Sequence, residues 1–155
     1  MSPIKYDLEI KFGSEYGPDE EKVLLEVLHK NAPTSGDYCI QFEEECAKYC
    51  GTKFARATSN GTTALFLSVL GLGIGPGDRV LTTPITWIAT AAVSSTLGAE
   101  VDFVDIDPVT FNLDPNKIEE KLTPNTKAVL PVHLYGQCCD MDAIMALAKK
   151  HGITV

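Results

Sequence analysis

The chain has 155 residues, of which 45% are hydrophobic and 22% charged, and this composition is typical of a globular protein with a sizeable core. Its formal net charge of −8 and its pI near 4.8 exclude a broad basic surface for nucleic acid or for an anionic membrane. The amino terminus contains no apolar core of a signal peptide, and the five cysteines include no Cys-x-x-Cys pair, so we expect reduced thiols in the cytoplasm and no metal site.

The first third of the chain predicts two amphipathic helices. Apolar residues recur at helical spacing over Asp19–Asn31, with acidic residues early and a lysine late. A second such pattern covers Asp37–Cys50, and Gly51 follows it at the position where a left-handed glycine commonly ends a helix. We therefore assign residues 1–52 to an N-terminal helical segment.

From residue 53 onward the pattern changes, because short apolar runs typical of strands alternate with helical patterns. The predicted strands cover Phe54–Thr58, Arg79–Pro84, Glu100–Ile106 and Thr126–Leu134, and a fifth begins at Ile153. The predicted helices cover Ala64–Leu70, Trp87–Leu97, a short segment from Asp114 to Leu122, and Asp140–His151. This alternation predicts a three-layer α/β domain over residues 53–155, with a mostly parallel sheet between two helical layers.

The turn Ser59-Asn60-Gly61-Thr62-Thr63 lies between a predicted strand and a predicted buried helix. Unpaired backbone N–H groups and the positive end of the helix dipole favour an anion at such a position, and Gly61 lets a phosphate approach the main chain closely. The alternative interpretation is that Ser59 or Asn60 is only an N-cap, since both residue types commonly begin helices.

Two further turns follow strands of the predicted sheet, at Pro84–Trp87 and at His133–Gly136. Ligands of parallel α/β sheets bind outside the carboxyl ends of the strands, so the three turns together favour the anion site over a plain cap. The glycines of Gly71–Gly77 are not a dinucleotide-binding motif, because they follow a helix and lack the required spacing. Asp105 and Asp107 alternate at a strand end, and we interpret them as turn-forming residues.

In this order and at these spacings, the segments of the chain resemble the DegT/DnrJ/EryC1/StrS family of pyridoxal-phosphate-dependent sugar aminotransferases. The resemblance runs from about the first helix to the last residue. It is carried by Ser59-Asn60-Gly61-Thr62-Thr63-Ala64-Leu65, Gly73-Ile74-Gly75-Pro76-Gly77-Asp78, Pro84-Ile85-Thr86-Trp87, Phe103-Val104-Asp105-Ile106-Asp107, Asn112-Leu113-Asp114 and Pro131-Val132-His133-Leu134-Tyr135-Gly136.

The resemblance implies the large domain of a fold-type-I aminotransferase, incomplete in this chain, with pyridoxal 5′-phosphate as cofactor. It implies that Gly61, Thr62 and Thr63 hold the cofactor phosphate and that Trp87 lies on the pyridine ring, for which a large flat indole is well suited. The alternative for Trp87, the only tryptophan, is a core filler. His133 is expected near the cofactor ring or the substrate, with a hydrogen-bonded core histidine as the alternative.

The activity that the resemblance implies is transfer of an amino group, typically from glutamate, to a keto group of a nucleotide-linked sugar. The family's site lies at a homodimer interface, so a second subunit is expected. The family's lysine and its carboxylate beside the pyridine nitrogen fall beyond Val155, so we expect no catalytic residue in this chain and interpret it as the N-terminal part of a larger enzyme.

Two alternatives to the aminotransferase stay open at the level of sequence. The first is a dehydratase of the same family, which uses the cofactor for sugar dehydration and lacks the lysine. The second is a truncated product that is catalytically incompetent and serves as a regulatory or interaction module.

Overall fold

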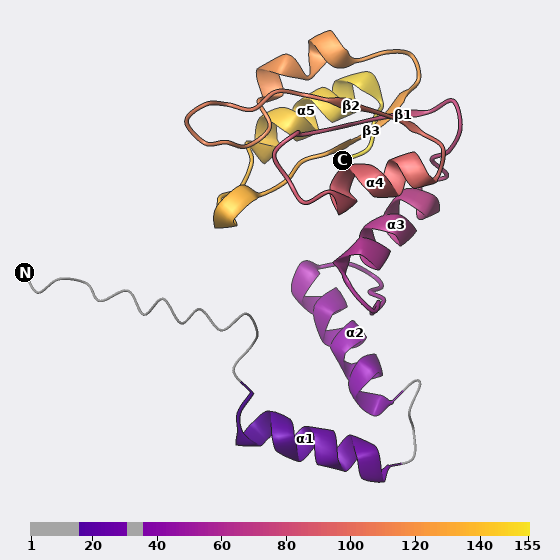
Figure 1. Ribbon diagram of the computed structural model, residues 1–155, viewed down its shortest axis with the longest axis vertical. Coiled ribbons are helices and arrows are strands. Elements are labelled where there is room, and N and C mark those ends of the chain that lie inside the picture. Colours follow the sequence, from indigo (N-terminus) through magenta and orange to yellow (C-terminus); the bar gives the residue numbers. More distant parts are fainter. Residues whose placement is uncertain (1–15, 31–35) are drawn as a thin grey trace, which may run out of the picture. The chain divides into compact units, whose positions relative to one another are not determined.

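The computed structural model describes residues 16–30 and 36–155 of the chain (Figure 1). Its contacts divide the chain into two compact units, Met1–Ala57 and Thr58–Val155. Asn31 and most of the predicted loop at 32–36 lie outside the described residues. Across the described ranges, no helix is both long enough and apolar enough to cross a membrane.

The first unit contains helices α1 (Pro18–His29) and α2 (Asp37–Cys50), which confirm the two helices predicted there. At the start of α1 the Glu20 carboxylate accepts a hydrogen bond from the Gly17 N–H at 2.7 Å, which satisfies one of the N–H groups that a helix start leaves open. Helix α2 ends at Gly51, whose φ of 67° is left-handed, as the sequence predicted.

The connector that follows α2 is not the strand that was predicted at Phe54–Thr58. Its backbone is irregular, and the Ala57 N–H donates to the Glu43 carboxylate on α2 at 2.9 Å instead of to a neighbouring strand. Arg56 contacts the same carboxylate at 2.6 Å. Because Glu43 supplies the acceptor that a sheet would otherwise provide, the connector groups with the helices, and the contact boundary falls after Ala57.

The second unit is built on a parallel sheet of three strands, β1 (Arg79–Thr82), β2 (Glu100–Phe103) and β3 (Thr126–Leu130), in the order β2-β1-β3. Val80 of β1 lies beside Val101 on one side and Ala128 on the other. Strand β3 stops before Pro131, which has no N–H to donate, so it is shorter than predicted. The predicted fifth strand is represented by one parallel bridge between Thr154 and Ala128.

Helices α3 (Gly61–Gly71), α4 (Ala89–Thr96) and α5 (Met141–His151) accompany the sheet, and all three were predicted. The segment predicted as one helix from Asp114 to Leu122 forms two short 3-10 helices, η1 (Pro115–Lys117) and η2 (Glu119–Lys121). The Asp114 carboxylate accepts the Asn116 N–H at 2.9 Å and so caps η1. A third 3-10 turn, η3 (Leu134–Gly136), follows β3.

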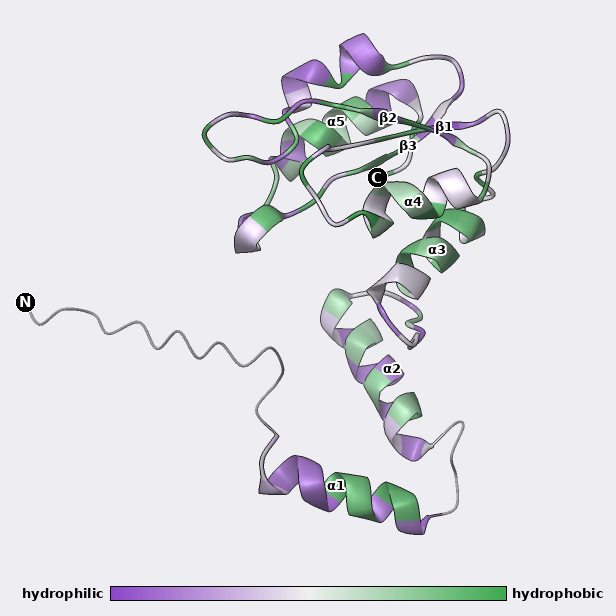
Figure 2. Ribbon diagram, viewed as in Figure 1, coloured by the Kyte–Doolittle hydropathy of each residue, from purple (hydrophilic) through white to green (hydrophobic). Residues whose placement is uncertain are grey.

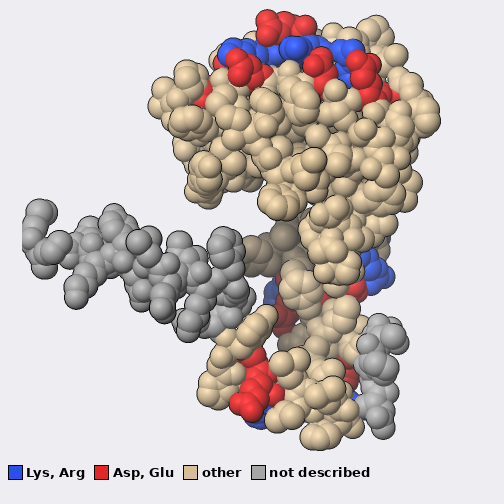
Figure 3. All heavy atoms as spheres, in the orientation of Figure 1, with Lys and Arg blue, Asp and Glu red and all other residues tan. Residues whose placement is uncertain are grey.

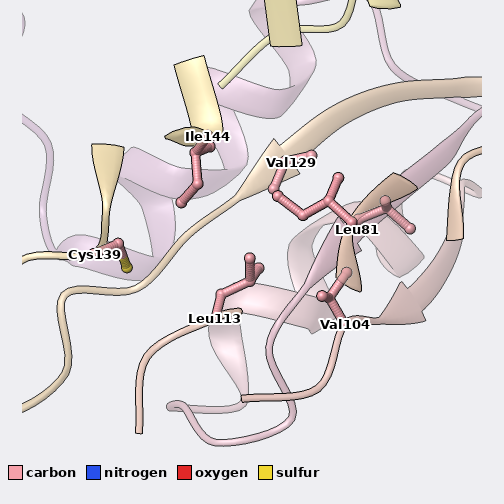
Figure 4. Packing of buried hydrophobic residues seen from close by; sticks show 7 residues of the cluster. Leu81, Val104, Leu113, Val129, Cys139 and Ile144 are labelled. Carbon is pink, nitrogen blue, oxygen red and sulfur yellow. The ribbon is translucent and has the colours of Figure 1, made fainter. Parts of the chain in front are cut away.

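Consecutive residues of the strands point to opposite faces of the sheet and build two separate cores. On one face, Leu81 and Val129 pack with Val104, Leu113, Cys139 and Ile144 of α5 (Figure 4). On the other face, Val80 and Ala128 pack with Val69 of α3 and Val93 of α4. The second unit is therefore a three-layer α/β arrangement with a parallel sheet, as predicted.

Helix α3 is apolar along most of its length, as the hydropathy colouring shows (Figure 2). The turn from α4 to β2 depends on Gly98, whose φ is 86°. A Cβ at this position would lie 2.9 Å from the ring carbon Cγ of Pro76, so the turn has room only for glycine.

Candidate functional site

The amino end of α3 is capped by Asn60. Its side-chain oxygen Oδ1 accepts the Thr63 N–H at 2.9 Å and the Thr63 hydroxyl at 3.1 Å, and that hydroxyl also lies 3.3 Å from Ser59 Oγ. Asn60 is therefore the N-cap of α3, and its cap uses the amide of Thr63 alone. In the part of the chain that the structure describes, the N–H groups of Gly61 and Thr62 have no protein acceptor.

These two free N–H groups make the helix end suitable for a phosphate. They lie in the first turn of an eleven-residue helix, where the helix dipole adds positive potential. A Cβ built on Gly61 meets nothing within 4 Å, so the space in front of its main chain is open. The three residues predicted to hold the phosphate therefore differ. Gly61 and Thr62 present free amides, whereas the amide and hydroxyl of Thr63 already bond to Asn60.

Trp87 lies between β1 and α4, and 78% of its surface is exposed. Its carbonyl accepts the Thr90 N–H at 3.1 Å, and the hydroxyls of Thr86 and Thr90 lie 2.9 Å apart, so the backbone of this corner is held by short-range hydrogen bonds. Such exposure is inconsistent with the core-filler alternative within this unit. The indole has free surface on which a flat ring could stack.

His133 follows β3 rather than belonging to it. Its ring nitrogen Nδ1 accepts the Cys139 N–H at 3.1 Å, and Cys139 Sγ contacts the Val132 carbonyl at 3.1 Å. A ring nitrogen that accepts a hydrogen bond carries no proton, so the neutral imidazole of His133 carries its proton on Nε2. Burial raises the pKa of the Cys139 thiol, so this cysteine packs as an uncharged side chain.

A hollow of about 470 Å³ is lined by residues of α3, of α4 and of the segment that contains β3 and His133. His133 lines it directly, together with Leu65 from the second turn of α3 and Thr90 from the first turn of α4. The other lining side chains are mostly apolar, and Ser68 adds a hydroxyl. Gly61–Thr63 and Trp87 are not part of its lining, but each lies within about one helical turn of a residue that is.

Asn112 is a structural residue that the residue-by-residue sequence reasoning missed. Its side chain is only 3% exposed, and it accepts the Leu134 N–H at 3.0 Å and donates to the Gln137 carbonyl at 3.1 Å. The sequence held one indication of this role: the polar side chain of Asn112 lies between the apolar residues Phe111 and Leu113. A polar side chain that is buried among apolar neighbours must have its hydrogen bonds satisfied within the protein.

Asp105 and Asp107 act as turn residues, which confirms their interpretation. The Thr110 and Val109 N–H groups hold the pKa of Asp107 below its ordinary value, because they donate to its carboxylate at 2.8 and 2.9 Å. Lys117 lowers the pKa of Asp105 through a contact at 3.0 Å. Both carboxylates are thus engaged by the protein itself.

Among proteins of known function, the chain is similar to two sugar-modifying enzymes. It is 51% identical over 138 residues to GDP-perosamine synthase of Caulobacter vibrioides, covering 88% of this chain and 37% of that protein. It is 48% identical over 129 residues to UDP-2-acetamido-2-deoxy-3-oxo-D-glucuronate aminotransferase of Pseudomonas aeruginosa, covering 83% of this chain and 36% of that enzyme. The chain therefore spans somewhat over a third of the length of these relatives.

Solved structures share its fold. An aminotransferase from Psychrobacter cryohalolentis superposes with a TM-score of 0.86 at 41% identity, over 90% of this chain and 36% of that one. NtdA from Bacillus subtilis, solved with bound cofactor PMP, gives a TM-score of 0.80 at 40% identity, over 88% of this chain and 32% of that one. The second unit thus has the α/β fold of these two proteins, of which the chain covers only part.

Residues 15–155 match the sequence profile of one protein family. The match includes every element of both units that the structure describes. The chain belongs to the DegT/DnrJ/EryC1/StrS aminotransferase family.

Proposed function

We propose that the protein containing this chain uses pyridoxal 5′-phosphate to transfer an amino group, with glutamate as donor, to a keto group of a nucleotide-linked sugar. The observation that carries this proposal is the amino end of α3, where the Gly61 and Thr62 amides are free and the space before them is open. Family membership and the names of the two relatives, which refer to GDP- and UDP-linked sugars, support the substrate class.

In this proposal the residues of the chain bind and orient. The amides of Gly61 and Thr62 donate to the cofactor phosphate, with the Thr62 hydroxyl as a further donor and Thr63 holding the cap. The exposed indole of Trp87 lies against the cofactor ring, and His133 offers its Nε2–H to the ring or the substrate. When bound, the cofactor carries the amino group between donor and acceptor and serves as the electron sink.

We also propose a homodimer that shares its active site, and a cytoplasmic location. The dimer is supported by the many large apolar side chains that the chain leaves exposed, among them Leu24, Leu28 and Phe42. The location is supported by the cysteines, all five of which lie in the described ranges and are free thiols.

Replacement of Gly61 by leucine in the full-length enzyme tests the phosphate site. A side chain at this position meets no protein atom near its Cβ, so the fold should persist while the new side chain occupies the space that a phosphate needs. We expect the affinity for pyridoxal 5′-phosphate, measured by calorimetry and by the visible absorption of the bound cofactor, to fall by at least tenfold, the equivalent of about 1.4 kcal/mol.

Gly71 provides the matched control, because it lies at the other end of the same helix and its Cβ position is equally open. Gly71→Leu should bind the cofactor like the unmodified enzyme. Unchanged cofactor binding by Gly61→Leu would contradict the proposed phosphate site.

A further inference from the structure

The turn after β3 holds a tyrosine in a backbone conformation that tyrosines rarely adopt. Tyr135 has φ 53° and ψ 30°, in the left-handed region, and Gly136 follows with φ 80°. This conformation costs free energy for a residue with a Cβ, and positions of this kind concentrate at functional sites. The ring of Tyr135 is 93% exposed, so packing of the ring within the chain does not offset that cost.

The turn is nevertheless held firmly, and Asn112 is central to it. Asn112 lies in the loop after β2. Its side-chain amide accepts the Leu134 N–H and donates to the Gln137 carbonyl, so it hydrogen-bonds to both ends of the turn. The Gln137 N–H also donates to the Leu134 carbonyl at 3.0 Å, and His133 accepts the Cys139 N–H. Because both atoms of the buried amide are used, the turn has one well-defined geometry.

The place of this turn in the fold indicates what the ring could contact. β1, β2 and β3 are parallel, so the corner that carries Trp87 and the loops that carry Asn112 and Tyr135 all follow carboxyl ends of strands. In Figure 1 the loop after β2 and the turn after β3 project from the same end of the sheet. The lysine and arginine side chains of this unit gather over η1 and η2 (Figure 3), where Lys117 and Lys121 form ion pairs with Asp105 and Asp102.

From these observations we infer that Tyr135 is a contact residue for the nucleotide-linked sugar and that Asn112 is its positioning residue. The flat ring offers an uncharged surface on which a nucleobase or the C–H face of a sugar can stack. Asn112 contributes by fixing the turn, not by touching the substrate. This inference rests on the proposed function, since it requires a nucleotide-linked sugar at this edge.

Substitutions that keep the backbone conformation but change the ring test the contact. Tyr135→Asn removes the ring and places a residue that tolerates the left-handed region, whereas Tyr135→Phe keeps the ring. In the full-length enzyme, calorimetric affinities for GDP, UDP, dTDP and GDP-perosamine should fall about tenfold in Tyr135→Asn for whichever of these ligands the unmodified enzyme binds. They should stay within about twofold in Tyr135→Phe, because the stacking surface remains.

Tyr49 of α2 supplies the matched control, because it is 92% exposed and can carry the same substitution to asparagine. Tyr49→Asn should bind the ligands unchanged. A loss with both the diphosphates and GDP-perosamine places the ring on the base, and a loss with GDP-perosamine alone places it on the sugar; either result supports the contact. Unchanged binding in Tyr135→Asn would overturn it.

The role of Asn112 is tested by Asn112→Asp, which keeps the acceptor for the Leu134 N–H and loses the donor to the Gln137 carbonyl. It should weaken ligand binding in the same direction as Tyr135→Asn. The double variant should lose little more than Tyr135→Asn alone, because Asn112 acts through the ring. Fully additive losses would overturn the positioning role.

Cofactor binding separates this inference from the proposed function. If the unmodified enzyme binds pyridoxal 5′-phosphate but none of the nucleotide ligands, the inference about Tyr135 is wrong and the phosphate site at α3 stands. If it binds neither cofactor nor nucleotide, both proposals are wrong.

Discussion

Helices α2 and α5 have much in common, yet they relate differently to the rest of their units. Both are amphipathic, and both end at a left-handed glycine, Gly51 for α2 and Gly152 for α5. Helix α5 buries Ile144 and Ala148, and Ile144 packs with residues of the sheet, whereas no residue of α2 is buried. An amphipathic pattern with a proper end thus specifies a helix, but it does not specify what covers the apolar stripe.

The largest effect that distinguishes the two helices is expected from truncating an apolar side chain in each. Ile144→Ala removes a fully buried side chain from the core in Figure 4 and should lower the free energy of unfolding by about 2–5 kcal/mol. Phe42→Ala on α2, where 57% of the side chain is exposed, should change it by no more than about 0.5 kcal/mol in a monomeric sample. Urea unfolding measures both, and equal losses would show that α2 is packed in the sample measured.

A smaller difference is expected from adding a methyl group to two left-handed glycines. Gly51→Ala should cost about 1–2 kcal/mol, because its Cβ position is open and only the backbone is strained. Gly98→Ala adds the 2.9 Å approach to Pro76 to the same strain, so it should cost about 1–3 kcal/mol more. Thermal unfolding of the two variants compares them directly, and a Gly98 variant no less stable than the Gly51 variant would contradict the close contact.

Substitutions at the helix N-caps of the two units should change the free energy of unfolding by smaller amounts. Asn60→Ala removes the bond to the Thr63 N–H and should cost about 1 kcal/mol in the cofactor-free protein, whereas Asn60→Gly should cost only a few tenths. The N-cap of α2 is Gly36, which has no side chain to accept a hydrogen bond, so Gly36→Asn should raise stability by roughly a few tenths of a kcal/mol. Chemical denaturation of all three variants checks the sign of each change; a destabilising Gly36→Asn would contradict the cap comparison.

The smallest effect concerns acid, and it affects the connector of the first unit. The Ala57 N–H and then Arg56 lower the pKa of Glu43 from its ordinary value of 4.5. A lowered pKa in the folded state means that Glu43 stabilises the fold above pH 4.5 and that this contribution is lost as the pH falls through the lowered value. The Ala57 end of the connector should therefore loosen from α2 as the pH falls through that lowered value.

Carboxyl titration and hydrogen exchange of the Ala57 amide follow this acid-dependent step. Glu43→Gln keeps an acceptor for the Ala57 N–H and removes the titrating charge. The protection factor of the Ala57 amide, the exchange rate of a free amide at the same pH divided by its own, should therefore no longer fall on acidification. A protection factor of the Ala57 amide that changes with pH in the same way in both proteins would contradict the prediction.

Much of the fold followed from local patterns. The bounds of α2 were predicted to the residue, because Gly51 ends the helix through its own backbone preference. The parallel sheet followed from alternating strands and helices, a rule of connection that needs no knowledge of partners. Segments whose structure depends on a partner were predicted less well: Phe54–Thr58 has strand-like residues, but its Ala57 N–H bonds to Glu43 instead of to a strand.

The candidate site shows the same limit. The free amides at the start of α3 were predictable, because the first N–H groups of a helix have no acceptor within the helix, and the cap at Asn60 was foreseen as well. The engagement of Thr63 by Asn60 and the contact between His133 and Cys139 depend on side-chain geometry that residue type does not reveal. Asn112 acts on residues more than twenty positions away, which local sequence does not indicate.

Trp87 is the only tryptophan of the chain, and its indole faces solvent beside the proposed cofactor site. All tryptophan emission from these 155 residues therefore comes from one fluorophore with a water-exposed spectrum. Its quantum yield and wavelength give an optical readout of occupancy at that edge of the sheet, free of background from tryptophans elsewhere in the chain.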